Sequence, residues 1–499
     1  MIYTYIFGVL AHGIALFNKF AWHDELQHGY LLSVNRAVPL GRWLRALLGY
    51  VNAQWFGGGN LSLPLVFGVV SLFFIGISVY LICKMLSIHE KPLQVVLCGI
   101  MVSFPVVTST FGYMFTAPYY FLALFLAVLA VYLIRERVSI WRCLISVLSI
   151  SCSLGLYQPY VGVTLSLYVI LIFFGVLKDR YESFGKILKR GFIYVGVSLA
   201  GLILYFVIWK LSMVILSTSA ANYQGMSSIG EGGIGAYLGG IQKAYAGFFL
   251  SFSSSHENIY PMSLSTVQWI AIVLSIVAGL WLVVRKFKKN KLEGALLLVL
   301  LVILPICMNI VYVMGSSSPD SKVHSLMLYG QAMLYVFLIC AGKELYEDRK
   351  KITRAFLSIV LSAILLLTGL NIYLDNSLYL KGEIVQKQSI VELTVMVSRI
   401  KSLEGYTDET PICFIMSGKR DATATKNSEF KQLALMPFSN ISPYHNRRNV
   451  INYLEKWCGY APPTVGDKKF RNKKEVKEMP DYPDDGSIKI IDGTVVIKW

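Results

Sequence analysis

The chain has 499 residues, of which 55% are hydrophobic and 15% are charged, and its mean hydropathy is +0.57. Such a composition excludes a water-soluble protein. The formal net charge of +17 would suit a nucleic-acid-binding protein. Most of this excess, however, lies in short loops between apolar segments, as in membrane proteins. Repeated apolar runs of about 18–25 residues predict a polytopic α-helical membrane protein.

We expect about 11 transmembrane helices, with boundary errors of a few residues. The first apolar run lacks the charged n-region and the cleavage site of a signal peptide, so we interpret it as a helix. The predicted spans are 2–19, 61–83, 93–111, 117–134, 141–157, 160–177, 191–217, 263–284, 294–314, 325–342 and 355–374.

Alternate loops differ in charge. One set contains 20 Lys and Arg residues, whereas the loops of the other set contain only six. Cytoplasmic loops carry the excess of Lys and Arg, so we expect a cytoplasmic N-terminus. Loops 18–60 and 218–262 and everything after Leu374 are then outside. The basic set consists of 84–92, 135–142, 178–190, 285–293 and 343–354.

The first outer loop contains an amphipathic segment from Gly41 to Tyr50. Three leucines fall on one helical stripe, with two arginines beside it. We therefore expect a helix that lies along the membrane surface. The leucines are Leu44, Leu47 and Leu48, and the arginines are Arg42 and Arg45.

The sequence predicts two domains. Residues 1–374 form a transmembrane domain with outer loops 18–60 and 218–262; the second loop is rich in Gly and Ser, so we expect it to be mobile. Residues 375–499 contain no segment long enough to span, and form a small outer α/β module of about the minimum size for its own core. Its predicted elements are a helix over 383–403 and strands over 411–416 and 493–497.

The outer module contains two of the eight cysteines, Cys413 and Cys458. An oxidising compartment would permit a disulfide bond between them. The alternative is a pair of unpaired thiols, and the sequence does not decide between the two.

Carboxylates are scarce on the predicted outer side of the transmembrane domain. Outside residues 375–499 the chain has 13 Asp and Glu, of which eight lie in the cytoplasmic loops. Among the five that remain, only Asp24 and Glu25 form a pair, directly after a span. The other three are Glu231, Glu257 and Asp320.

The acid pair is a candidate catalytic centre. Repulsion between neighbouring carboxylates favours keeping a proton on one of them. A group in that state suits general base catalysis on a hydroxyl. The alternative is a structural role, in which an acid caps a helix or pairs with Lys19 or Arg42.

Several cations could bind a phosphate group. Arginine forks such as those of Arg36 and Arg42 suit phosphate, which in a membrane cavity would belong to a lipid. Lys210 lies within an apolar run, where an ammonium indicates a partner, although it could also extend to the interface about five residues away. His324 and Lys322 begin the tenth predicted span and could also contact phosphate.

Weaker signals come from Tyr157 and Gln158, at a tight outer turn. They could line a sugar site, or they could simply end helices. The sequence has no phosphate-binding Gly-Lys-Ser/Thr loop, no His-Glu-x-x-His pair and no Gly-x-Ser-x-Gly elbow. We therefore expect no metal site.

The chain contains three short motifs, Trp22-His23-Asp24-Glu25, Gly41-Arg42-Trp43-Leu44 and Gly155-Leu156-Tyr157-Gln158-Pro159. Together with the layout of the whole membrane region, these motifs resemble the serotype-converting O-antigen glucosyltransferases of bacteria and their phages. These are membrane glycosyltransferases with the C-type fold. Relatives often carry two aspartates at the acid pair, whereas this chain has Asp-Glu, so which acid acts stays open.

The resemblance implies an inverting glucosyltransferase of the bacterial inner membrane, with residues 1–374 as its catalytic domain and a periplasmic C-terminal domain. The donor would be polyprenyl-phosphate-linked glucose, and the acceptor a hydroxyl of a surface polysaccharide, the O-antigen. It implies no cofactor, and a lipid-sugar flippase and synthase as functional partners. The implied residues are Asp24 and Glu25 as base, Arg42, Arg36, Lys210 and His324 at the phosphate, and His23, Tyr157 and Gln158 at the substrate.

Two other functions are alternatives. A transporter or flippase of lipid-linked saccharide would show paired halves and polar sites at the membrane midplane, and the sequence shows neither. A membrane acyltransferase or polysaccharide polymerase is kept open by His23 and His28, because acyl transfer needs a histidine on the reaction side.

Overall fold

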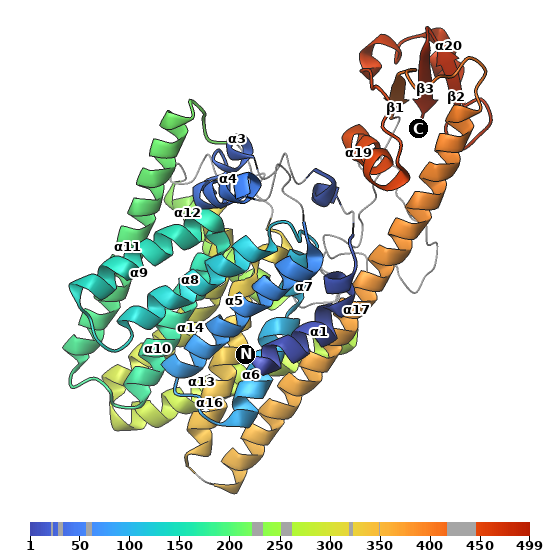
Figure 1. Ribbon diagram of the computed structural model, residues 1–499. Coiled ribbons are helices and arrows are strands. Elements are labelled where there is room, and N and C mark those ends of the chain that lie inside the picture. The colour runs from blue at the N-terminus through green and yellow to red at the C-terminus, as the bar shows by residue number, and fades with distance from the viewer. Residues whose placement is uncertain are drawn as a thin grey trace. The chain divides into compact units, whose positions relative to one another are not determined.

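The computed structural model separates into two units, which we call the membrane unit and the C-terminal unit (Figure 1). The membrane unit consists of Met1–Lys19 and Gly29–Ser377. The C-terminal unit consists of Phe20–His28 and Leu378–Trp499, a grouping that the sequence does not predict. The structure describes residues 1–20, 23–27, 33–55, 62–221, 233–250, 262–318, 323–348, 350–416 and 446–499.

Within these described ranges, seven helices are long and apolar enough to cross a membrane, and one bent pair makes an eighth. Their outward faces carry large apolar side chains, such as Phe192 and Ile203, which are 74% and 63% exposed. A membrane protein is therefore confirmed, but a count of 11 spans is not. The seven are α5 (Pro64–Met85), α8 (Ala117–Ile134), η2 with α10 (Gln158–Tyr160 and Val161–Leu177), α11 (Phe184–Ile215), α13 (Met262–Lys289), α14 (Lys291–Met308) and α17 (Lys351–Lys401).

The bent pair consists of α6 (Lys91–Ser103) and α7 (Pro105–Phe111), which meet at an angle of 44°. The bend falls at Phe104, whose extended backbone (ψ 130°) follows from the proline after it. The shorter helices and turns of this unit are α1 (Ile2–Phe17), α3 (Val34–Ala37), α4 (Trp43–Trp55), α9 (Ile140–Leu156), α15 (Ile310–Met314), η4 (Ser325–Met327), η5 (Tyr329–Ala332) and α16 (Met333–Tyr346).

Part of the segment expected to be a mobile loop is helical. Helix α12 spans Ile234–Leu250, and Asn309 Nδ2 donates a hydrogen bond to the Ala244 carbonyl over 3.0 Å. Gly247 lies against the Tyr312 ring so closely that a Cβ would come within 2.6 Å of it. The loop prediction is wrong for these residues, where Gly240 and Gly247 serve helix packing. Most of the Gly/Ser-rich stretch 227–233, on which the prediction of mobility rests, lies outside the described residues.

Helix α17 also differs from expectation. It is one continuous helix of 51 residues, where the sequence predicts a span and a separate helix. No glycine or proline interrupts residues 370–380, so the helix continues from the membrane unit into the C-terminal unit.

The C-terminal unit contains a three-stranded sheet in the order β1-β3-β2. Strand β3 (Thr494–Lys498) pairs in parallel with β1 (Ile412–Ile415) and antiparallel with β2 (Ile488–Ile491). The two predicted strands are confirmed, and β2 was missed. The remaining elements are η1 (His23–Gln27), α19 (Arg447–Cys458), η7 (Asp467–Lys469) and α20 (Lys474–Glu478).

The sheet separates the two cysteines. Alternate residues of β1 point to opposite faces: Phe414 joins the main core with α17 and α19, and Cys413 joins a smaller core with Phe470. Cys458 packs against the main core. Both thiols are free, so the disulfide alternative is wrong.

Candidate functional site

The basic loops lie together at one end of the membrane unit, which we call the basic end. Ion pairs connect them: Lys178 lies 3.0 Å from Glu344, and Lys343 lies 2.9 Å from Glu90. Other pairs at this end join Arg285 to Glu344 and Asp348, and Lys286 to Asp179 and Glu293.

The candidate site occupies the other end of the same helices. Tyr120 lies in the first turn of α8 and Arg135 follows its last residue, so the rise of a helix separates the two levels by roughly 22 Å. At the Tyr120 level, α3 and α4 cover the ends of the bundle.

Helix α4 is amphipathic, as predicted. Arg45, Ala46 and Gly49 are buried, whereas Leu47 and Tyr50 are 54% and 55% exposed. An exposed apolar face is typical of a helix that lies in a membrane surface.

Arg42 is held by two tyrosines. Its Nη1 donates a hydrogen bond to the Tyr120 hydroxyl over 2.9 Å. Its guanidinium carbon lies 5.7 Å and 5.5 Å from the ring centres of Tyr120 and Tyr157. The two rings stack on each other with centres 3.8 Å apart. This geometry is that of a cation–π interaction, and it fixes the orientation of a partly exposed guanidinium.

Two of the motifs noted in the sequence meet here. Gly41 has a positive φ of 73°, which turns the chain into Arg42 and α4. Trp43 packs onto Gly155, where a Cβ would come within 2.5 Å of the indole. Tyr157, two residues further on, contacts Arg42. Residues more than 100 positions apart in the sequence thus build one site.

Side chains of the bundle hold the turn before α4. Gln158 Nε2 donates to the Leu40 carbonyl over 2.9 Å and lies 3.1 Å from the Tyr205 hydroxyl. Trp209 Nε1 donates to the Val38 carbonyl over 2.8 Å. These bonds satisfy backbone carbonyls that the membrane would otherwise leave without partners.

A second guanidinium lies beside the first. Arg45 is only 2% exposed. Burial, and next the positive charge of Arg42, lower the pKa of Arg45 to about 10, against the opposing effects of Tyr120 and Tyr119. Arg45 therefore remains protonated at neutral pH, and the site carries two adjacent positive charges.

The structure places the other predicted residues of this unit less centrally. Arg36 is exposed on α3, and Lys210 is exposed on α11, which favours the interfacial interpretation of that lysine. His324 is partly buried just before η4. Tyr157 and Gln158 are buried, so they contact Arg42 and Leu40 rather than an open sugar site.

The acid pair belongs to the C-terminal unit, whereas Arg42 belongs to the membrane unit. Asp24 and Glu25 lie in η1, where Asp24 is partly exposed and Glu25 is 5% exposed. The Leu26 carbonyl accepts hydrogen bonds from Asn452 Nδ2 and Lys456 Nζ, over 3.0 and 3.1 Å. Helix α19 thus anchors the segment that carries the acid pair.

For His23 only the backbone in η1 is described. The other predicted residues that lie outside the described residues are Trp22, His28, Glu231, Glu257, Asp320 and Lys322.

Asp375 is a buried carboxylate that sequence reasoning assigned to the outer module. It lies in the membrane unit, is fully buried on α17, and its Oδ1 accepts a hydrogen bond from Thr108 Oγ1. Its Oδ2 and the Asn371 Nδ2, one turn earlier, have no hydrogen-bond partner among the described residues. The sequence contains one signal for this position: Asp375 continues the helical pattern of the last predicted span, 355–374.

No group of three or more metal-ligating side chains occurs in the described part of the chain. The Arg42 site offers instead two guanidinium groups and stacked aromatic rings, which suit an anion such as a phosphate ester.

A bundle of apolar helices with a cationic site at one end defines a polytopic membrane protein whose site suits an anionic group. A family model described as glucosyl transferase GtrII matches residues 13–337, more than half of the chain. The chain therefore belongs to the GtrII glucosyl transferase family, which confirms its resemblance to serotype-converting O-antigen glucosyltransferases. No curated protein and no solved structure matches it.

Family membership makes the protein a glycosyltransferase, rather than a transporter or an acyltransferase. The matched region contains Arg42, Gly155 and the acid pair, and it ends before Asp375.

Proposed function

We propose that the protein is an inverting glucosyltransferase that moves glucose from a polyprenyl-phosphate donor to a hydroxyl of the O-antigen, on the periplasmic side of the inner membrane. The observation that carries this proposal is Arg42, a partly exposed guanidinium fixed by Tyr120 and Tyr157 beneath a membrane-surface helix. A lipid phosphate at that level would meet a preorganised cation.

The distribution of charge supports the periplasmic assignment. Lys and Arg gather in the loops of the basic end, and such loops stay in the cytoplasm. The Arg42 site, at the opposite end of α8, would then face the periplasm. The donor would have to reach it in the outer leaflet, so a lipid-sugar synthase and a flippase are the implied functional partners.

In the proposed reaction the acceptor hydroxyl oxygen attacks C1 of the glucose from the face opposite the phosphate. The C1–O bond breaks and its electron pair goes to the phosphate oxygen, which inverts the configuration at C1. Asp24, or its neighbour Glu25, accepts the proton of the hydroxyl. Arg42 neutralises the charge on the leaving phosphate, and no cofactor enters the scheme.

The remaining candidates have supporting roles in this proposal. Arg36 and His324 would extend the phosphate site, and Lys210, on the lipid-facing side of α11, would attract the phosphate as the donor enters. His23 would bind the sugar.

The test is glucosyl transfer by purified enzyme from a labelled lipid donor to a lipid-linked polysaccharide, for Asp24→Asn and Glu25→Gln. We expect the variant that lacks the base to lose activity by a factor of about 10² or more. The other acid should tolerate substitution better, which would identify the base. If both variants expressed normally and kept wild-type turnover, the acid pair would have no role as base.

A further inference from the structure

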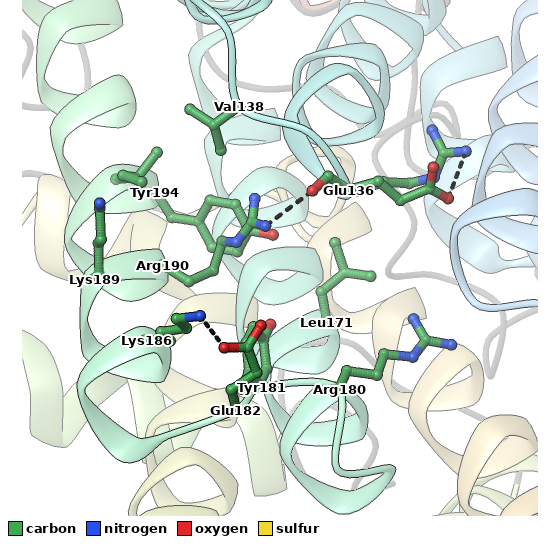
Figure 2. Close-up of a pocket in the computed structure, with 13 residues that line it drawn as sticks. Glu136, Val138, Leu171, Arg180, Tyr181, Glu182, Lys186, Lys189, Arg190 and Tyr194 are labelled. Atoms are coloured by element: carbon green, nitrogen blue, oxygen red, sulfur yellow. Dashed lines mark hydrogen bonds and ion pairs between the residues drawn. The ribbon is translucent and has the colours of Figure 1, made fainter.

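A cavity of ≈ 510 Å³ opens at the basic end. It lies where α8 ends, where α10 passes into the 178–183 turn, and where α11 begins (Figure 2). This size falls within the range of small-ligand pockets. The lining residues that matter below are Arg135, Arg180, Lys186, Lys189, Arg190 and Leu171.

The cavity is strongly cationic. Five Lys and Arg side chains line it, against two carboxylates, Glu136 and Glu182. Glu136 pairs with Arg135 over 3.1 Å, and Glu182 pairs with Lys186. Both acids are therefore already engaged by cations of the same wall.

Three cations remain. Arg190 donates to the backbone carbonyls of Ile134 and Glu136, over 2.9 and 3.0 Å, and so ties α11 to the end of α8. Figure 2 shows the bond between Arg190 and Glu136, and it shows Arg180 and Lys189 at separate positions among the lining residues. Within the described residues neither Arg180 nor Lys189 has an ion pair, and both are exposed. Their positive charge is available to an external anion.

The apolar surface beside the cavity indicates which kind of anion the cavity would bind. Leu171, Val138 and Ile193 contribute to its lining. Along α11, which starts at the cavity, Phe192 and Val195 are 74% and 56% exposed. Such a surface is covered by acyl chains, so an anion that entered here would be continuous with a lipid tail.

Trp141 marks the level of the cavity in the membrane. It lies in the first turn of the neighbouring helix α9 and is 72% exposed. Exposed tryptophans are enriched where headgroups meet the hydrocarbon. At the level of Trp141 the cations of this cavity would lie among lipid headgroups rather than in bulk water.

We propose that this cavity binds the phosphate headgroup of an anionic membrane lipid, with the acyl chains along α9 and α11. Arg180 and Lys189 supply the positive charge that attracts the phosphate, and Arg190 holds the wall in place. The site lies at the opposite end of α8 from Arg42, so it is separate from the proposed catalytic site. Because α11 continues from this cavity to Trp209, which bonds Val38, the lipid would steady the helix that supports the turn before α4.

The experiment uses the full-length protein, delipidated in a neutral detergent. Thermal unfolding is followed as phosphatidylglycerol is added, with phosphatidylcholine and inorganic phosphate as separate arms. We compare the wild type with the double variant R180E/K189E. A matched double variant, K351E/R354E, makes the same charge change on exposed cations at the start of α17, away from the cavity.

We expect phosphatidylglycerol to raise the unfolding temperature of the wild type and of K351E/R354E. It should bind R180E/K189E at least five-fold more weakly than it binds the wild type. Phosphatidylcholine and inorganic phosphate should have little effect. Equal binding by the two double variants would overturn the site. If inorganic phosphate raised the unfolding temperature as much as phosphatidylglycerol, the ligand would be a soluble anion and the proposal of a lipid would be wrong.

If R180E/K189E does not fold, the neutral variant R180Q/K189Q replaces it, with the same criterion. Native mass spectrometry of these samples gives a second readout that does not depend on unfolding. Retained phosphatidylglycerol on the wild type but not on R180Q/K189Q supports the proposal, and equal retention contradicts it.

Discussion

The indole of Trp43 fills the space that a side chain at Gly155 would need: a Cβ built on Gly155 would lie 2.5 Å from Trp43 Cε2. This contact sets the distance between α4 and α9. Because Arg42 immediately precedes Trp43, the same contact positions the guanidinium over Tyr157. Substitution of one glycine should therefore move a charged group that it does not touch.

We predict that Gly155→Ala lowers glucosyl transfer at least tenfold, since a displacement of about 1 Å can cost a factor of 10² in rate. The matched control is Gly196→Ala, on α11, where nothing lies within 4 Å of the added Cβ. Both variants add one methyl group to a helix of the bundle. Initial rates with the labelled donor would measure the effect, and equal rates for the two variants would refute a positioning role for Gly155.

Arg42→Lys should be as damaging as removal of the charge. A lysine keeps the charge but loses the planar fork that lies over Tyr120 and Tyr157. We expect a fall in activity of tenfold or more for both Arg42→Lys and Arg42→Gln. Arg137→Lys, an exposed arginine at the basic end, provides the control. Full activity of Arg42→Lys would show that charge alone suffices.

Gln158 should contribute to stability through the turn before α4. Gln158→Leu leaves the buried Leu40 carbonyl and Tyr205 hydroxyl without this partner. The expected loss in the free energy of unfolding is about 1–3 kcal/mol. Thermal unfolding of the purified protein measures it. If Gln158→Leu unfolds at the wild-type temperature, these hydrogen bonds do not hold the turn.

The membrane class and the Arg42 region could be predicted from the sequence, because both depend on local pattern. Long apolar runs specify bilayer-spanning helices, and the stripe of leucines beside Arg42 and Arg45 specifies α4. The stacking of Tyr157 on Tyr120 could not be predicted, because it joins helices that share no sequence signal. The contact between Trp43 and Gly155 could not be predicted either, because the motifs contain both residues but do not indicate that they lie together.

Other errors have identifiable physical causes. The glycines of 234–250 look like loop residues, yet Gly240 and Gly247 allow α12 to approach Ser316 and Tyr312. The polar residues after Leu374 predict that the membrane domain ends there, which would place Asp375 in the outer module, whereas the structure places it in the membrane unit. Its carboxylate is buried by tertiary packing against α7, a contact between residues 267 positions apart.

The bond between Glu90 and Lys343 should make stability depend on pH. Partial burial raises the pKa of Glu90, but the hydrogen bond and the charge of Lys343 outweigh it, so that this pKa lies below the ordinary value of a glutamate. A carboxyl group whose pKa is lower in the folded than in the unfolded protein stabilises the fold at pH values above its unfolded-state pKa. This stabilisation is lost as the pH falls through its folded-state pKa.

Glu90→Gln should therefore unfold at a lower temperature than the wild type at pH 7, and the difference should shrink below about pH 4.5. Lys343→Met should lower the unfolding temperature more than Glu90→Gln does, because Lys343 Nζ also bonds the Ser87 carbonyl at this end. The double variant should be little worse than Lys343→Met alone. A temperature difference that stayed constant from pH 7 to pH 4 would rule out the ionised carboxylate as its source.

Asp375 and Thr108 should be energetically coupled. Thr108→Val removes the donor and leaves a fully buried carboxyl group without it, whereas Asp375→Asn keeps an acceptor for the threonine hydroxyl. We expect Asp375→Leu and Thr108→Val each to cost about 1–3 kcal/mol of unfolding free energy, and Asp375→Asn to cost less. The double variant Asp375→Leu with Thr108→Val should fall short of the sum of the single effects by about 1 kcal/mol. Strict additivity would mean that the bond contributes nothing. If Asp375→Asn folded normally but lost glucosyl transfer, the buried carboxyl group would join the acid pair as a residue that the reaction requires.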